Sequence, residues 1–174
     1  RGEEEQSLRL RMPISEVSDA EISIARARLS RLMDERSAGD FRVLSYSTEA
    51  TMSRHPPAST ASISTGSGID RDSVSGIRAR YATLKPGYTY RFSSAGRIET
   101  SYTLTAVGLS GATAGSRLPY TMAKGRKEGV NHDIRASYDH RITRRMNVIA
   151  TYNGRRLADR DFEHFGQVQM RAVF

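Results

Sequence analysis

The chain has 174 residues and a formal net charge of +8, because 24 Arg and 3 Lys outnumber the 19 acidic residues. It contains no Cys, which excludes a disulfide framework, a thiolate zinc site and a cysteine nucleophile. No segment approaches the run of about 20 apolar residues that a membrane-spanning helix needs. Three classes of protein remain: a nucleic-acid binder, a soluble β domain, and an outer-membrane β-barrel, whose strands need not be hydrophobic overall.

The N-terminal segment, residues 1–40, begins with a strand pattern and then becomes ambiguous. Apolar and polar residues alternate over residues 8–14, and a period of two is typical of a strand with one apolar face. A capping box, which is a typical helix start, follows at residues 18–21, and apolar residues come after it at helical spacing. The Arg-Ala alternation in the same stretch is instead that of a strand. We therefore expect either one short helix or a strand over residues 21–33.

The central region is rich in Ser and Thr, and it alternates weakly over residues 41–54 and 58–65. Apolar residues occupy odd positions over residues 77–81 but even positions over residues 88–92. A slip of one residue exchanges the two faces of a strand. We therefore expect either a hairpin turn or a bulge at residues 84–87, and the pattern does not distinguish between them.

The C-terminal half shows the clearest alternation. Apolar residues stand at every second position in five segments, and each is about as long as a strand. Strands are therefore predicted for residues 88–92, 98–106, 134–140, 146–152 and 166–174.

The connections in this half alternate in length. Short turns at residues 93–96 and 141–145 alternate with a long connection at 109–130 and an intermediate one at 156–163. Outer-membrane barrels join their strands in this manner, with short periplasmic turns and longer external loops.

These patterns predict an all-β fold, an antiparallel up-and-down transmembrane β-barrel of roughly 8–10 strands. We expect residues 41–174 to form the barrel and residues 1–40 to supply a strand followed by a helix or a second strand. One domain throughout, or a fragment of a larger barrel, are the alternatives.

The last predicted strand carries the most specific pattern. Gly166, Val168, Met170 and Ala172 occupy one face, and Phe174 ends it. In this the chain resembles the C-terminal part of bacterial outer-membrane β-barrel proteins. The resemblance implies that these five residues form the signal that the barrel-assembly machinery reads. Other pieces are similar to the ends of larger outer-membrane proteins: Gly96-Arg97, Leu118-Pro119-Tyr120, Asn153-Gly154-Arg155-Arg156, His164-Phe165-Gly166 and Arg171-Ala172-Val173-Phe174.

The resemblance implies a bacterial outer-membrane location and a structural or transport role, such as passage of small solutes or anchoring of a subunit. It implies outer-membrane lipid and the assembly machinery as partners, with lipopolysaccharide and other chains of an envelope complex as further candidates. Aromatic side chains near predicted strand ends are expected to form an interfacial girdle. They are Tyr81, Tyr88, Tyr90, Phe92, Tyr102, Tyr138, Tyr152, Phe165 and Phe174.

The polar faces of the predicted strands carry charges of both signs. In a barrel these faces point inward, and unpaired charge in a narrow lumen is costly, so we expect a hydrogen-bonded ionic network. Its members are Arg78, Arg80, Arg91, Glu99, Arg135, Asp139 and Arg171. The alternative is a lumen that attracts anions, which needs more strands or a partner chain. Cations of the connections are expected at lipid headgroups or in water, among them Arg117, Arg126, Lys127 and Arg144.

No catalytic, cofactor or metal site is predicted, and we expect no enzyme activity. The histidines, His55, His132, His140 and His164, lack metal-binding spacing, since residues eight apart on a strand lie about 26 Å from each other. Ser137 and His140 would lie on opposite faces of one strand, so no Ser–His–Asp set forms.

Two other classes remain as alternatives. One is a soluble basic β-sandwich surface module, in which the apolar faces meet each other. The other is a nucleic-acid-binding β domain, which the charge favours. The arginines are scattered through nearly every segment, however, and no aromatic platform for single strands is visible. Nucleic acid is therefore not among the expected partners.

Overall fold

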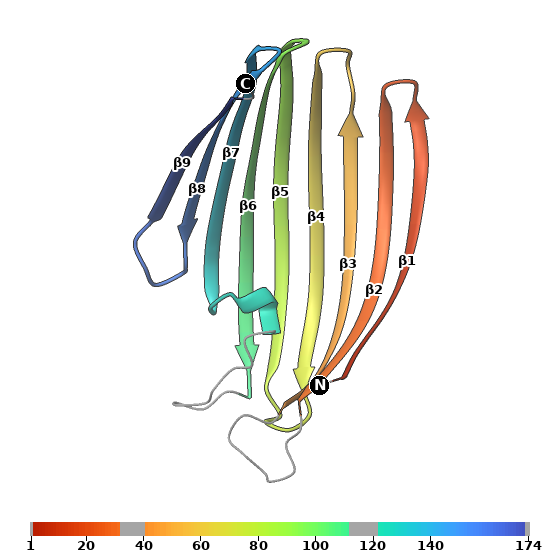
Figure 1. Ribbon diagram of the computed structural model, residues 1–174. Coiled ribbons are helices and arrows are strands. Elements are labelled where there is room, and N and C mark those ends of the chain that lie inside the picture. The colour runs from red at the N-terminus through yellow and green to blue at the C-terminus, as the bar shows by residue number, and fades with distance from the viewer. Residues whose placement is uncertain (1, 32–40, 112–121, 173–174) are drawn as a thin grey trace.

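The computed structural model describes residues 2–31, 41–111 and 122–172, which form nine β-strands and one short 3₁₀ helix (Figure 1). The helix, η1 (Met122–Gly125), lies between β6 and β7. The fold is all-β with almost no helix, as predicted. The strands are β1 (Gly2–Ser15), β2 (Ser18–Arg31), β3 (Phe41–Arg54), β4 (Ser59–Asp72), β5 (Arg78–Ser93), β6 (Gly96–Ser110), β7 (Gly129–Thr143), β8 (Met146–Arg156) and β9 (Glu163–Ala172).

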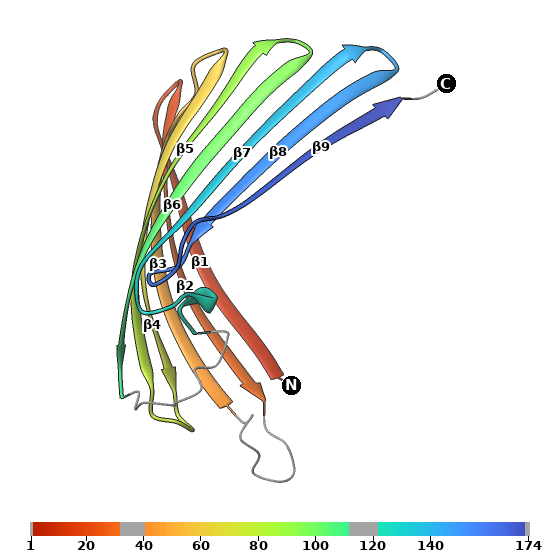
Figure 2. The ribbon, with the colours of Figure 1, turned by 90° about the vertical axis from the view of Figure 1, so that its left-hand side faces the viewer.

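The strands form one antiparallel sheet in chain order, with β1 and β9 at its edges. The predicted up-and-down order is therefore confirmed, whereas the sheet is not closed. The sheet is strongly curved, and η1 lies on its concave side (Figure 2). Two-residue turns at 16–17, 94–95 and 144–145 mark the end that we call the short-turn end. The opposite end, with the connections 73–77, 111–128 and 157–162, is the long-loop end.

The ambiguous segment near the N-terminus is a strand and not a helix, because β2 covers residues 18–31. β2 pairs along its length with both β1 and β3, so hydrogen bonding to two neighbours overrides the local helix signal. Asp19, an intervening residue of the predicted capping box, binds Arg11 of β1 and lies 3.2 Å from His55 Nε2 in the β3–β4 turn. Residues 32 and 33 lie outside the described ranges.

β5 runs without interruption through residues 84–87, so the expected hairpin or bulge is absent there. Its register with β6 is the same at Leu84 as at Gly87, and Pro86 lies opposite Ile63 of β4. Proline has no N–H, so it removes a bond from the ladder without shifting the register. The apolar side chains therefore change face along one strand, with Tyr81 on the concave side and Tyr88 on the convex side.

The buried core is small and lies on the concave side near the long-loop end. Tyr81 extends across β4 to a hydrogen bond with the Ser47 side chain, and Gly68, directly opposite Tyr81, leaves room for its ring. A single-layer sheet with so small a core leaves most of its large apolar side chains exposed. The buried apolar residues are Val43, Ile77, Ala79, Tyr81, Val107, Met122 and Ala123.

Gly68→Ala is expected to lower the free energy of unfolding by about 1–3 kcal/mol, as overpacking does. The reason is that a Cβ at this position would overlap the ring of Tyr81. Equilibrium unfolding in denaturant measures the change. Gly108→Ala is the matched control, since a Cβ there meets no atom within 4 Å. Equal losses in the two variants would contradict the assigned packing of Tyr81.

Candidate functional site

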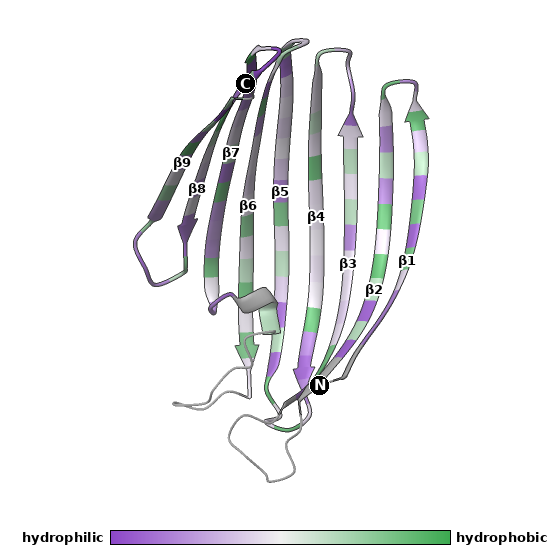
Figure 3. Ribbon diagram, in the orientation of Figure 1, coloured by the Kyte–Doolittle hydropathy of each residue, from purple (hydrophilic) through white to green (hydrophobic). Residues whose placement is uncertain are grey.

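Large apolar side chains lie on the convex face of all nine strands, and charged residues join them at the long-loop end. Register and alternation assign each strand residue to a face, and η1 marks the concave one. The alternation is visible as changes of hydropathy along β1 and β2 (Figure 3). Leu8 and Val168, on the two edge strands, are 71% and 75% exposed. Exposed large side chains of this face include Leu8, Leu10, Met12, Ile22, Ile24, Tyr46, Met52, Ile63, Ile69, Leu84, Tyr88, Tyr90, Phe92, Ile98, Val130, Tyr138, Tyr152, Val168 and Met170.

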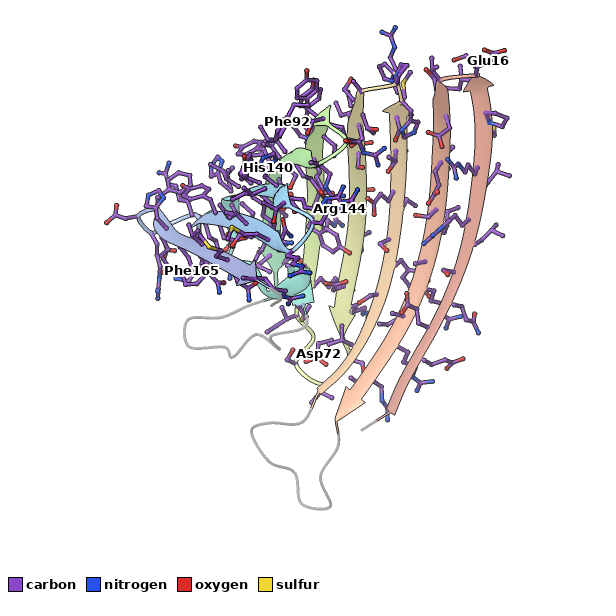
Figure 4. The ribbon with its side chains drawn as sticks, turned by 45° about the horizontal axis from the view of Figure 1, so that its top comes forward. Glu16, Asp72, Phe92, His140, Arg144 and Phe165 are labelled. Carbon is purple, nitrogen blue, oxygen red and sulfur yellow. The ribbon has the colours of Figure 1, made fainter. Side chains whose placement is uncertain are left out.

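Aromatic rings cluster on this face near the short-turn end, where Figure 4 labels Phe92 and His140. The rings of Phe92 and Tyr138 are nearly parallel, with centroids 5.9 Å apart, and His140 lies 5.6 Å from Phe92. Gly96 of β6 makes this packing possible, because a Cβ there would overlap the Phe92 ring. Phe92 and Tyr138, two of the predicted girdle residues, therefore lie together on this face.

A second aromatic cluster lies on β6–β9, nearer the long-loop end. The Tyr102 hydroxyl is 2.6 Å from His132 Nδ1, and the Tyr152 hydroxyl is 2.7 Å from His164 Nδ1. Phe162 lies between the two histidines, with ring centroids 6.3 Å and 5.6 Å away. The sequence predicted the tyrosines as girdle residues but not the histidines, whose partners are on neighbouring strands.

The two clusters bound a band of the convex face on β6–β9. Along β7, Tyr138 and His132 are six positions apart, which corresponds to about 20 Å of strand. The outward residues between these limits carry no charge, as Ile134 and Ala136 of β7 and Ala150 of β8 illustrate. Two other predicted girdle residues lie elsewhere: Tyr81 is in the core, and Phe165 is on the concave face.

The concave face is polar and carries five of the seven residues of the predicted ionic network. Glu99 faces Ser137, which places it diagonally between Arg91 and Arg135. Asp139 lies directly opposite Arg97, which the prediction omitted. Among the described residues none of these groups forms a direct ion pair, so the network stays a prediction. The five are Arg91, Glu99, Arg135, Asp139 and Arg171.

Arg78 and Arg80 depart from that prediction because they face the convex side. β5 keeps its alternation through Pro86, so even-numbered residues point away from Arg91 along the whole strand. Both side chains are exposed, whereas Ala79 and Tyr81 beside them are buried.

Cations of the β6–β7 connection form ion pairs, although the sequence placed them at headgroups or in water. Arg126 Nη2 is 2.5 Å from Asp133 Oδ2, and the Arg126 side chain is only 16% exposed. Arg155 Nε approaches the same carboxylate at 3.8 Å. Lys127 Nζ is 2.8 Å from Asp159 Oδ2, and this hydrogen bond lowers the pKa of Asp159 below its ordinary value. Arg117 lies outside the described residues.

The helix η1 is anchored to the concave side by one carboxylate. The Ala123 N–H donates to Asp70 Oδ2 at 2.6 Å, and Asp70 is 2% exposed. Met122 and Ala123 then cover Tyr81 and its neighbours. The helix η1 thus lies over the concave face at this level, a contact that sequence reasoning missed because its partners are 53 residues apart.

The predicted assembly signal lies on β9. Gly166, Val168, Met170 and Ala172 all face the convex side, and Val168 and Met170 are among the most exposed apolar side chains of the described chain. Phe174 lies outside the described residues.

Comparison with protein-family models finds no match, and comparison with curated proteins finds none either. In the described ranges no helix is long and apolar enough to cross a membrane. Within the same ranges, no group of three or more His, Asp or Glu side chains is placed to hold a metal ion.

Asp70→Ala is expected to release η1 from the sheet. The buried Ala123 N–H would lose its acceptor, which costs about 1–3 kcal/mol and raises local opening roughly 5- to 150-fold. Limited trypsin digestion followed by mass spectrometry measures this as faster cleavage after Arg126. Asp139→Ala removes a concave carboxylate that does not contact η1, and an equal increase in that variant would contradict the anchor.

Proposed function

We propose that this chain forms the wall of an integral outer-membrane β-barrel with a structural or transport role. The observation that carries the proposal is the apolar convex face, which continues across nine strands opposite a polar concave face. Transmembrane barrels alternate in the same sense, with apolar side chains toward lipid and polar side chains toward the lumen. Strands of 10 to 16 residues also reach the length of about 9–11 residues that a tilted strand needs to span a bilayer.

The aromatic cluster around Phe92 supports the same proposal. Barrels carry girdles of aromatic residues at both interfaces of an apolar band about 25 Å tall. On β6–β9 the clusters around Phe92 and Phe162 bound an uncharged band of about 20 Å of strand, which at a tilt of about 40° is about 15 Å of height and shorter than such a band. We therefore assign only the cluster around Phe92 to an interface, where Tyr and His rings carry suitable polar atoms. The short-turn end then corresponds to the periplasmic side, and the long-loop end to the outside.

Closure is the further requirement of this proposal. In an antiparallel sheet of nine strands, β1 and β9 run in the same direction, so they cannot pair with each other in the antiparallel mode. An odd number of additional strands, from the same polypeptide or another one, would close the barrel with antiparallel pairs throughout. Other chains of an envelope complex are thus candidate partners, together with the assembly machinery that would read β9.

The proposed role leaves two uses for the concave face. If its charges pair with one another, the lumen is filled and the protein is a structural anchor. If they stay separated in a wider barrel, the lumen takes small solutes, and η1 narrows it near the long-loop end. Conductance in a planar bilayer distinguishes the two uses.

The first prediction concerns the behaviour of the folded protein. We expect it to require detergent for solubility and to shift its band on an SDS gel when boiled, because a closed strand ladder has no free edge from which to open. Gel mobility with and without heating measures this. A protein that is monomeric without detergent would favour the soluble β-sandwich module. If that protein also bound nucleic acid in a salt-dependent manner, a nucleic-acid-binding β domain would be favoured instead.

The second prediction tests the assigned faces. Ala136→Arg is expected to destabilise the membrane-inserted protein by about 2–4 kcal/mol, the cost of an arginine on the lipid face near mid-bilayer, since Ala136 lies on the convex face between Tyr138 and His132. Ser137→Arg, one residue away on the concave face, is the matched control and should be tolerated. Refolding yield into lipid vesicles, scored by the heat-shifted band, measures both. Equal effects would show that the faces are wrongly assigned.

A further inference from the structure

An arginine cluster interrupts the apolar character of the convex face at the long-loop end. Arg71 of β4 and Arg78 of β5 are directly opposite each other, and Arg80 is diagonal to Arg71 on the same face. All three side chains are exposed. On β2, Arg26 and Arg28 lie in the same two cross-strand rows, since the register joins them through β3 to β4 and β5.

Among the described residues, no ion pair joins an acidic side chain to the three central arginines, Arg71, Arg78 and Arg80. The strand residues directly opposite them on β3 and β6 are uncharged: Leu44 is opposite Arg71, Ser110 is opposite Arg78, and Gly108 is opposite Arg80. Asp70 and Asp72 point to the concave side, where Asp70 binds η1 and Asp72 accepts hydrogen bonds from the N–H groups of Arg42, Val74 and Ser75.

The flanking arginines differ from the central three. Glu4 of β1 lies opposite Arg28, and Arg26 lies 5.8 Å from the centre of the Tyr46 ring, a cation–π contact. Directly opposed like charges destabilise a strand pair. The pair Arg71–Arg78 therefore lacks the local compensation that its neighbours have, and an anion from outside the chain would supply it.

The arginine cluster lies at the height of the phosphate layer of a bilayer, if Phe92 lies at the opposite interface. On β5 the outward residues between Arg80 and Phe92 are all apolar, from Ala82 to Tyr90. The twelve residue steps from Arg80 to Phe92 correspond to about 40 Å of strand, or about 30 Å of height at a tilt of about 40°. That height equals the hydrocarbon thickness of a bilayer, about 30 Å, so Arg78 and Arg80 would reach the headgroup layer when Phe92 lies at the opposite interface.

We propose that Arg71, Arg78 and Arg80 form a binding site for the phosphate of an anionic lipid headgroup in the leaflet at the long-loop end. The guanidinium group is always charged, and its planar fork matches two phosphate oxygens. Two opposed forks can therefore clamp one phosphate while their stems lie along the apolar surface. This inference rests on the proposed membrane location, and it names the lipid class that the surface selects.

The test measures lipid selectivity of the reconstituted protein. Full-length protein is inserted into phosphatidylcholine bilayers, and insertion is confirmed by the heat-shifted band. Electron spin resonance of spin-labelled phosphatidic acid and phosphatidylcholine then gives their relative association with the protein surface. We expect a preference for phosphatidic acid of about fivefold, which follows from roughly one favourable arginine contact at the membrane surface.

The variant R71Q/R78Q should abolish that preference. R91Q/R97Q is the matched control, since Arg91 and Arg97 are also directly opposed and the charge change is the same, but they face the concave side. The control should keep the preference. In the unaltered protein, 1 M NaCl should reduce it, because the Debye length falls to about 3 Å, and this measurement needs no variant to fold.

Each outcome decides one claim. An inserted protein that keeps its preference as R71Q/R78Q, or loses it equally in both variants, overturns the lipid site and leaves the membrane proposal standing. A preference that 1 M NaCl does not change also overturns the site. A protein that never inserts or shifts on heating overturns the membrane proposal and the site with it.

Discussion

The alternation of side chains on a one-layer sheet is the constraint on which the rest of this structure depends. Each strand is hydrogen-bonded to its neighbours, so every side chain of the sheet lies on one of two faces, and each face needs a suitable environment. One face carries a small core and many polar groups, and the other carries large apolar side chains from every strand. No sheet or helix among the described residues covers that second face. Its environment therefore decides the stability of the whole fold.

The distribution of arginine follows from the same separation of faces. On the concave side, Arg97 faces Asp139, and Arg126 contacts Asp133, so charge meets opposite charge within the chain. On the convex side charge is absent from the band between the aromatic clusters, and it returns in the Arg71–Arg78 pair. The inner charges thus lie near charges of opposite sign, whereas the Arg71–Arg78 pair lies at the edge of an apolar surface with no ion pair among the described residues.

The strands and their order could be predicted from the sequence because the period of two is a local signal. The prediction failed where a local sequence signal competes with hydrogen bonding between neighbouring strands. The capping box around Asp19 favours a helix in isolation, but β2 has a partner on each side. At Pro86 the pattern slips by one residue while the register does not, so the apolar side chains cross from one face to the other. The anchor of η1 on Asp70 was not predictable, since nothing near either partner in the sequence marks it.

If the surroundings are lipid, the open edges of the sheet and its uncovered convex face must be considered together. A bilayer offers no water to the unpaired N–H and C=O groups of β1 and β9, and each unsatisfied group there costs several kcal/mol. A loop lying along the edge would satisfy only a few of them, whereas a strand satisfies alternate residues along its whole length. The apolar convex face and the closure of the sheet therefore require each other. In a membrane, a nine-stranded sheet with this outer surface would have no open edge if β1 and β9 paired with each other in the parallel mode, or if further strands paired with both edges.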